Sequence, residues 1–180
     1  MFSEERKEYI QIMSQTDFII QLKQKDEEAF HTLYDQYVHL IYHIAYSYTR
    51  NVEDAEDIVS DVFVRILHSI DQYQEKGKFK EWICQITRHI ALNYVTRNKE
   101  KDTILSDEII STTADATNHH REMMDLFCAH LEEDTIRIMV LRFIYDYKFK
   151  DIACCLGMTI GKVQGLYYDG LEILRRVYER

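Results

Sequence analysis

The chain contains no proline and only five glycines in 180 residues. Proline and glycine interrupt helices more strongly than other residues, so a chain that nearly avoids both can form long uninterrupted helices. Hydrophobic residues make up 46% of the chain, which is enough for a packed core and excludes a disordered tail. The sequence therefore predicts an all-α fold.

Apolar residues at intervals of three and four predict where the helices lie. The longest such pattern follows Asp26, a predicted N-cap, and continues to Tyr48. The next helix, at about 53–70, has a predicted buried stripe formed by Ala55, Ile58, Val59, Val62, Ile66 and Leu67. The other predicted helices cover about 16–24, 78–99, 120–131, 133–145, 149–156 and 160–178.

Residues 102–121 differ from the rest of the chain because they are rich in Ser, Thr, Asp and Asn and have weak apolar periodicity. Such a composition is typical of a linker. Residues 102–130 carry one basic and six acidic side chains, so the predicted linker is acidic. We therefore predict two small helical domains, at 10–101 and 122–180, joined by a linker at 102–121.

The first residues, MFSEERKEYIQIM, are too charged for a signal peptide, and no run of about 18 apolar residues predicts a membrane span. We therefore expect a cytoplasmic protein with no membrane contact of its own. The four cysteines form no Cys-x-x-Cys pair, so buried free thiols are expected rather than a zinc site or a disulfide. No cofactor and no metal are predicted.

Charge is unevenly distributed along the chain, whose net charge is −9. A negative total argues against a protein that simply coats DNA, for which a basic balance is expected. Residues 53–61 contain five acids and no base, whereas residues 76–101 contain seven Lys or Arg against two Glu. One half of the chain therefore has an acidic helix followed by a basic one.

The segment 149–171, FKDIACCLGMTIGKVQGLYYDGL, has the spacing of a helix-turn-helix. Ala153 is small where two short helices would cross, and Gly157 supplies the left-handed turn that ends the first helix. Thr159 is a good N-cap for the second helix, which would lie in the DNA major groove. A plain helical hairpin without DNA is the alternative. The residues expected to meet DNA are Lys150, Thr159, Lys162, Gln164, Tyr167 and Tyr168.

The N-terminal half contains three ordered motifs. Residues 54–67, DAEDIVSDVFVRIL, match the pattern D-A-E-D-x-V-Q-x-x-F apart from Ser60 in place of Gln. Residues 29–37 match A-F-x-x-L-Y-x-x-Y. Residues 79–97, FKEWICQITRHIALNYVTR, begin with the pattern F-x-x-W-L-x-x-I, with Ile83 in place of Leu. Further along, His89 and Asn93 replace the usual Asn and Asp. Together these motifs resemble those of the extracytoplasmic-function (ECF) sigma factors of the sigma-70 family.

The resemblance covers residues 26–101 and 131–178, and it implies a sigma factor that directs promoter-specific transcription initiation. It implies binding to core RNA polymerase through the β′ clamp helices and the β flap, to the −10 and −35 elements of promoter DNA, and to an anti-sigma factor. Alternatively, the acidic residues of the DAED motif are simply the solvent-exposed side of an amphipathic helix. The polymerase-binding residues implied by the resemblance are Asp54, Glu56, Asp57, Ser60, Asp61, Phe63 and Arg65.

The basic segment fits contact with the −10 element. Opened DNA exposes bases that can stack or enter a pocket, while cations hold the phosphates. The 76–80 loop is the expected place for an extruded base, and Trp82 is expected either to stack on a base or, as its place in the apolar stripe favours, to belong to the core. The residues expected to contact the −10 element are Lys76, Lys78, Lys80, Arg88, His89, Asn93 and Arg97, mostly on one face.

The recognition helix departs from the family pattern T-V-K-S-R-L-x-R-A-R. Gln164, Leu166 and Asp169 stand where cations are usual, so weak −35 binding is expected. Two alternatives follow. The chain is either a sigma factor with an unusual −35 element, or a sigma-like protein that binds polymerase or an anti-sigma factor and acts as a regulator or antagonist.

Two other classes of protein are alternatives, namely a zinc-dependent or other enzyme and a structural helical adaptor. His39 and His43 have a spacing that can bind zinc, but the residues between them lack the Glu of a zinc protease and no third ligand is evident. The sequence contains neither a Gly-rich phosphate loop nor a Gly-x-Ser-x-Gly elbow, so an enzyme is not expected. The second alternative, a helical adaptor, would bind neither polymerase nor DNA, so a pull-down with core polymerase would distinguish it from a sigma factor.

Overall fold

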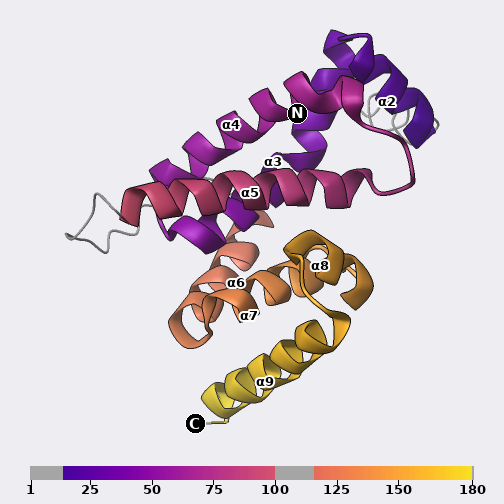
Figure 1. Ribbon diagram of the computed structural model, residues 1–180. Helices are drawn as coiled ribbons and strands as arrows, with labels where there is room; N and C mark the ends of the chain where they lie inside the picture. Colours follow the sequence, from indigo (N-terminus) through magenta and orange to yellow (C-terminus); the bar gives the residue numbers. More distant parts are fainter. Residues whose placement is uncertain (1–13, 100–115, 180) are drawn as a thin grey trace.

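The computed structural model describes residues 14–99 and 116–179, and within these ranges the secondary structure is helical, with no strand. The predicted all-α fold is therefore confirmed. Figure 1 shows the helices in chain order. Their bounds are α2 Gln15–Lys23, α3 Glu27–Thr49, α4 Val52–Ser69, η1 Ile70–Gln72, α5 Phe79–Lys99, α6 Ala116–His130, α7 Glu133–Met139, η2 Val140–Ile144, α8 Phe149–Leu156 and α9 Ile160–Tyr178.

Side-chain caps and one glycine define several of these helix ends. The Asp26 carboxylate accepts a hydrogen bond from the Ala29 N–H at 2.8 Å, and α3 begins at the next residue. The Thr159 hydroxyl accepts one from the Lys162 N–H at 3.3 Å at the start of α9. Gly157 ends α8 with a φ of 64°, where an L side chain would be strained. These three predictions are confirmed.

Two predicted elements differ from the structure. Helix α6 begins at Ala116, inside the stretch assigned to the linker, because the turn ATNHH continues without interruption into the apolar pattern that follows. The other linker residues, 102–115, lie outside the described residues. The helix predicted at 133–145 is α-helical only as far as Met139 and continues as the π-helical turn η2, which makes the bend before α8.

Helices α3, α4 and α5 pack against one another, with α2 and η1 at one end (Figure 1). Ile41, Ile58 and Ile83, one from each helix, are fully buried in their shared core. Leu67 of α4, by contrast, is 40% exposed. It follows the buried Ile66, and one residue along a helix turns the side chain by about 100°, away from α3 and α5. The predicted burial of Leu67 is therefore wrong.

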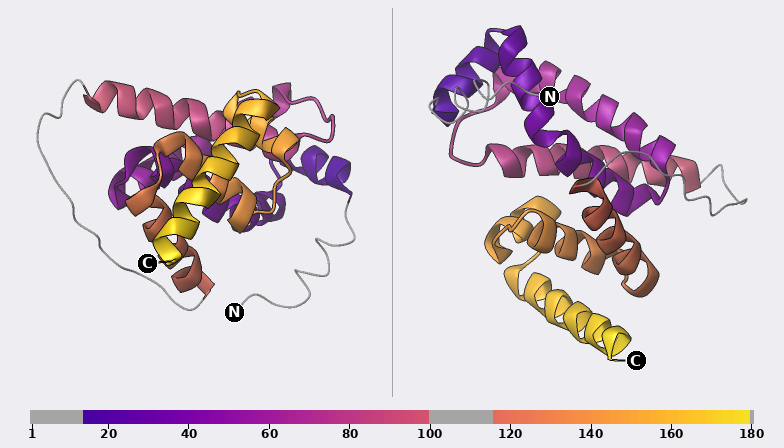
Figure 2. Two further views of the ribbon diagram at one scale, coloured as in Figure 1. Left: turned by 90° about the horizontal axis from the view of Figure 1, so that it is seen from below. Right: turned by 180° about the vertical axis from the view of Figure 1, so that it is seen from behind.

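The C-terminal helices dock on the N-terminal ones. Helix α8 packs on α5 and α7 packs on α3, whereas α9 packs on α7 and α8 at the far side of the molecule (Figures 1 and 2). One continuous cluster of buried side chains includes Phe79 and Ile83 of α5 together with Ile152 and Leu156 of α8. The division into two domains stays a prediction, and the buried core extends across it.

Two glycines of α9 have different surroundings, and we expect opposite effects when each is replaced by alanine. A Cβ at Gly165 would meet no atom within 4 Å, so Gly165→Ala should raise the free energy of unfolding by about 1 kcal/mol through helix propensity. A Cβ at Gly170 would lie 2.6 Å from Thr135 Cγ2 and 2.7 Å from Met139 Cε, so Gly170→Ala should lower it by about 1–3 kcal/mol. Urea denaturation measures both changes, and stabilisation by both would contradict the close packing of α9 on α7.

Candidate nucleic-acid and protein interfaces

Helix α4 presents an acidic surface to solvent on the side of the molecule away from α7, α8 and α9 (Figure 1). Its buried stripe faces α3 and α5. Towards its C-terminal end the exposed side becomes apolar, with Val64 53% and Leu67 40% exposed. Exposed apolar side chains with charged neighbours are common in protein–protein interfaces, which have an apolar centre and a polar rim. The exposed residues predicted to bind polymerase are Glu56, Asp57, Ser60, Asp61 and Arg65.

Two predicted polymerase contacts take part in the fold itself. Phe63 is 6% exposed, and its ring lies 6.3 Å from the Phe30 ring and 4.9 Å from the Tyr34 ring, centroid to centroid. Phe63 therefore joins α4 to α3, and its contact with polymerase stays a prediction. Asp54 is half-buried and accepts a hydrogen bond from Tyr94 Oη at 2.6 Å, so this carboxylate holds α4 against α5.

The loop between η1 and α5 exposes two of the predicted −10 cations, Lys76 and Lys78. Gly77 between them has a φ of 68°, which is the turn expected of the predicted hinge. At the base of the loop the Trp82 ring is half-buried and lies 4.8 Å from the Tyr73 ring. This packing supports the core interpretation of Trp82.

An open pocket of about 320 Å³ lies beside this loop, and Gly77 is part of its wall. Phe18, Tyr37 and Phe79 supply aromatic surface. Burial raises the pKa of the Tyr37 phenol well above its usual value, so the hydroxyl stays neutral at neutral pH. Aromatic rings can stack on a nucleobase, and amides and hydroxyls can bind its edges. The polar side chains of the lining are Gln15, Thr32, Gln36, Lys80 and Glu81.

The predicted −10 residues of α5 do not all lie on one face. His89, Asn93 and Arg97 are exposed and recur every four residues, so they line one side of the helix. Arg88 is half-buried on another side, where its guanidinium lies beside Gly157 of the helix-turn-helix. The structure therefore places three of these four residues on one face, as the prediction that they mostly share a face allows, and separates Arg88 from them.

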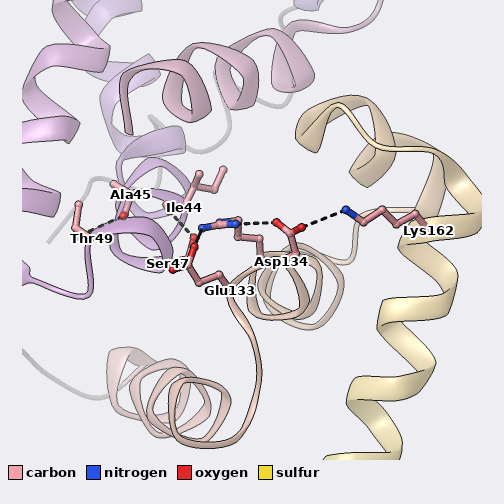
Figure 3. A network of polar contacts seen from close by, with 8 residues as sticks. Ile44, Ala45, Ser47, Thr49, Glu133, Asp134 and Lys162 are labelled. Carbon is pink, nitrogen blue, oxygen red and sulfur yellow. Dashed lines mark hydrogen bonds and ion pairs between the residues drawn. The ribbon is translucent and has the colours of Figure 1, made fainter. Parts of the chain in front are cut away.

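The helix-turn-helix has the predicted frame but few free cations on its second helix. Lys162 lies in the first turn of α9, and its Nζ is 3.3 Å from Asp134 Oδ2 of α7 (Figure 3). Near the other end of α9, Arg176 forms an ion pair with Glu172 of the same helix, and Arg175 forms one with Glu179, the C-cap. Thr159 serves as the N-cap of α9. The charges of α9 are thus largely compensated by neighbouring acids.

The aromatic residues of α9 belong partly to the core. The Tyr167 ring is half-buried and lies 5.0 Å from the Phe149 ring, so it takes part in packing, and its contact with DNA stays a prediction. Tyr168, Gln164 and Lys150 are exposed, and each is accessible to a partner as predicted. The exposed surface of the second helix therefore combines polar and aromatic side chains with cations that are paired to neighbouring acids.

Helix α7 carries a buried charge that sequence patterns alone did not single out. The Arg137 side chain is 7% exposed and pairs with Glu133 at 2.7 Å and Asp134 at 2.8 Å. Its guanidinium lies 3.5 Å from the centroid of the Tyr48 ring on α3. The two acids, three and four residues before an arginine in an apolar run, are a visible local signal. The contact with Tyr48 has no such signal, because Tyr48 is distant in sequence.

Among the side chains that the structure describes, no His, Cys, Asp and Glu residues form a group suited to a metal ion. All four cysteines are free thiols, as predicted, and two of them are buried. His43 Nδ1 hydrogen-bonds to Tyr145 Oη at 2.6 Å, and His39 is exposed. In the described part of the chain, no helix combines the length and apolarity that a bilayer crossing requires.

Comparison with known proteins identifies the family. Residues 33–101 match Sigma-70 region 2. The chain is 26% identical over 170 residues to the ECF RNA polymerase sigma factor SigX of Bacillus subtilis (strain 168), with 85% of each chain covered. It is 30% identical over 137 residues to the RNA polymerase sigma factor SigV of the same organism, with 74% of this chain and 81% of SigV covered.

The fold is similar to that of the sigma factor RpoE, solved in complex with the anti-sigma factor NepR from Bartonella quintana. The TM-score is 0.66 at 16% identity, with 83% of this chain and 96% of that chain covered. The chain belongs to the ECF sigma factors of the sigma-70 family. Members of this family are transcription initiation factors and not enzymes, so the protein is a transcription initiation factor.

Proposed function

We propose that this protein binds core RNA polymerase through the exposed surface of α4 and directs promoter-specific transcription initiation. The observation that carries the proposal is the acidic surface formed by Glu56, Asp57 and Asp61, which lies within the family motif and is exposed among the helices that the structure describes. The cytoplasm is the proposed compartment. An anti-sigma factor is a proposed partner, supported by the complex in which the similar sigma factor RpoE was solved.

The pocket beside Gly77 is the proposed site for a base extruded from the −10 element. Its wall includes the largely buried side chains of Phe18, Tyr37 and Phe79, which offer a small apolar contact area, and Gln15 and Gln36 offer amide groups for the base edge. Lys76 and Lys78 flank Gly77 in sequence and are exposed, so their cations are available to the neighbouring phosphates. The exposed row on α5, which includes His89 and Arg97, extends this surface along the helix.

The second helix of the helix-turn-helix is the proposed contact with a −35 element. Its neutral surface, with Lys162 paired to Asp134, also favours a second candidate function. In that alternative the protein binds polymerase or an anti-sigma factor as a regulator and does not itself direct transcription. Transcription in vitro with core polymerase and a library of randomised promoters separates the two. Transcripts with defined start sites support the sigma factor, whereas stable polymerase binding without initiation supports the regulator.

The loop cations should make binding to single-stranded DNA depend on salt. Replacing both lysines, Lys76→Gln with Lys78→Gln, should reduce the slope of log Kd against log salt by about 1.4, because each phosphate contact to a single strand contributes about 0.7. Fluorescence anisotropy with a labelled single strand, in the presence of core polymerase, measures the slope. Lys25→Gln, at an exposed lysine of the α2–α3 turn, is the control; an equal change there would exclude a specific role for the loop.

A further inference from the structure

Helix α9 has one open side along the turns that follow its N-cap. Val163 and Gly170 are buried where α9 packs on α7 and α8. Gln164 follows Val163 directly, and one residue along a helix turns the side chain by about 100°, so Gln164 and Tyr168 point away from that packing and are exposed. In Figures 1 and 2, α9 lies at the end of the molecule remote from α4 and α5. A partner can therefore reach this side of α9 directly.

Two glycines on the open side leave part of the helix backbone uncovered. Gly161 and Gly165 are one turn apart, and a Cβ at either position would meet no atom within 4 Å. The backbone of α9 can therefore approach a partner more closely here than at positions that carry a side chain. Such an approach suits the floor of the DNA major groove, where the base edges lie. The glycines permit this contact, whereas the neighbouring side chains decide its chemistry.

The basic side chains of α9 are each paired with an acid. Lys162 Nζ lies 3.3 Å from Asp134 Oδ2 of α7 (Figure 3), and Arg175 and Arg176 pair with glutamates of α9 and its C-cap. A cation that is neutralised within the protein must leave its acid before it can replace a counterion on a DNA phosphate. Phosphate contacts therefore contribute little to the affinity of α9 for DNA, and base contacts must supply most of it.

The exposed side chains of the first three turns match the major-groove edge of A·T pairs. The Gln164 amide can donate to N7 and accept from the N6 amino group of one adenine, a bidentate pattern specific to that base. Ile160 and Tyr168 are 46% and 59% exposed and offer apolar surface, which fits the C5-methyl group of thymine. Guanine is bound most often by Arg or Lys, and these side chains of α9 are already paired.

The spacing of these side chains suits successive base pairs. Ile160, Gln164 and Tyr168 follow one another every four residues, which is about 6 Å along the axis at about 1.5 Å per residue. A duplex rises by about 3.4 Å per step. A helix that lies along the groove would therefore address base pairs about two steps apart, with the adenine contact between two thymine contacts.

We propose that α9 selects an A·T-rich element through base-edge contacts: Gln164 binds an adenine, and Ile160 and Tyr168 pack on thymine methyl groups. This inference rests on the proposed role of the helix-turn-helix at the −35 element, and it names the base pairs of that element. Because the cations of α9 are paired, base sequence rather than the charge of the duplex decides where α9 binds.

Duplexes that lack single groups test the proposal. A randomised promoter library, transcribed by core polymerase with the full-length protein, first supplies the selected upstream element. In that element, 2′-deoxyuridine in place of thymidine removes only the C5-methyl group, and 7-deaza-2′-deoxyadenosine in place of deoxyadenosine removes only the N7 acceptor. Fluorescence anisotropy of the labelled duplex, with the protein and core polymerase present, measures Kd for each substitution.

We expect each removed methyl group at a contacted thymine to raise Kd about twofold to fourfold, and loss of N7 at the contacted adenine to raise it about fivefold. Gln164→Ala should abolish the response to 7-deazaadenine, and Ile160→Ala should abolish the response to one removed methyl group. Ile173→Ala is the matched control, since Ile173 is 40% exposed near the other end of α9, and it should leave every response unchanged.

A selected element rich in G·C pairs, or an unchanged Kd for both modified duplexes, would overturn the A·T readout and leave sigma activity intact. Equal responses in the Ile160 and Ile173 variants would also contradict the assigned contacts. If the library yields transcripts from defined start sites but no preferred upstream sequence, α9 does not read DNA and the inference alone fails. If no transcripts form, the proposed function fails with it.

Discussion

Reversing two acids on the exposed surface of α4, Asp57→Lys with Asp61→Lys, should weaken binding to core RNA polymerase by about 100-fold, or roughly 1.4 kcal/mol for each reversed charge. Both side chains are exposed on the side of α4 opposite its buried stripe. If the partner surface complements these acids with cations, as the proposal implies, a lysine at either position would repel it. Competition with a labelled sigma factor for core polymerase measures the loss.

A matched double reversal elsewhere distinguishes a specific surface from net charge. Asp35 of α3 and Asp71 of η1 are exposed acids outside α4, so Asp35→Lys with Asp71→Lys changes the net charge of −9 by the same amount. This control should keep its affinity for polymerase within about twofold, since isolated surface charges contribute little. Equal losses in both double variants would contradict a dedicated polymerase surface on α4.

The second large effect concerns Phe63, which the motif assigns to polymerase binding and which the structure buries between α4 and α3. Phe63→Ala should lower the free energy of unfolding by about 3–4 kcal/mol, because a buried aromatic ring is removed and a cavity remains between α4 and α3. The neighbouring Val64 is 53% exposed, so Val64→Ala should change stability by no more than about 0.5 kcal/mol. Urea denaturation followed by circular dichroism gives both values.

The same two variants also separate stability from partner binding. Under conditions where both are folded, Val64→Ala should weaken polymerase binding more than Phe63→Ala, since only the Val64 side chain reaches the α4 surface. If Phe63→Ala leaves stability unchanged and abolishes polymerase binding, its ring is a contact residue and the packing against Phe30 and Tyr34 is wrong.

Helix positions were the most predictable part of the fold. Near-absence of proline and glycine, together with apolar residues every three or four positions, located α3, α4, α8 and α9 to within about a residue of their ends. Capping chemistry is equally local, which is why Asp26 and Thr159 were recognisable as N-caps. Family motifs added the chemical division between the acidic α4 and the basic loop and helix that follow it.

The role of a side chain on its helix depended on contacts that are distant in sequence. A motif match at Phe63 says nothing about which residues surround it, and the rings of α3 bury it. Three polar side chains of the pocket, Gln15, Thr32 and Gln36, come from segments that no local pattern connects to Gly77.

The sequence by itself determined an all-helical chain of the sigma-70 family with an acidic helix, a basic loop and a helix-turn-helix poor in cations. Only the tertiary structure decided that Arg88 faces Gly157 instead of solvent, and that Arg137 packs on Tyr48. The physical reason is that periodicity records which side of a helix is apolar, whereas the packing of helices decides which distant element covers that side.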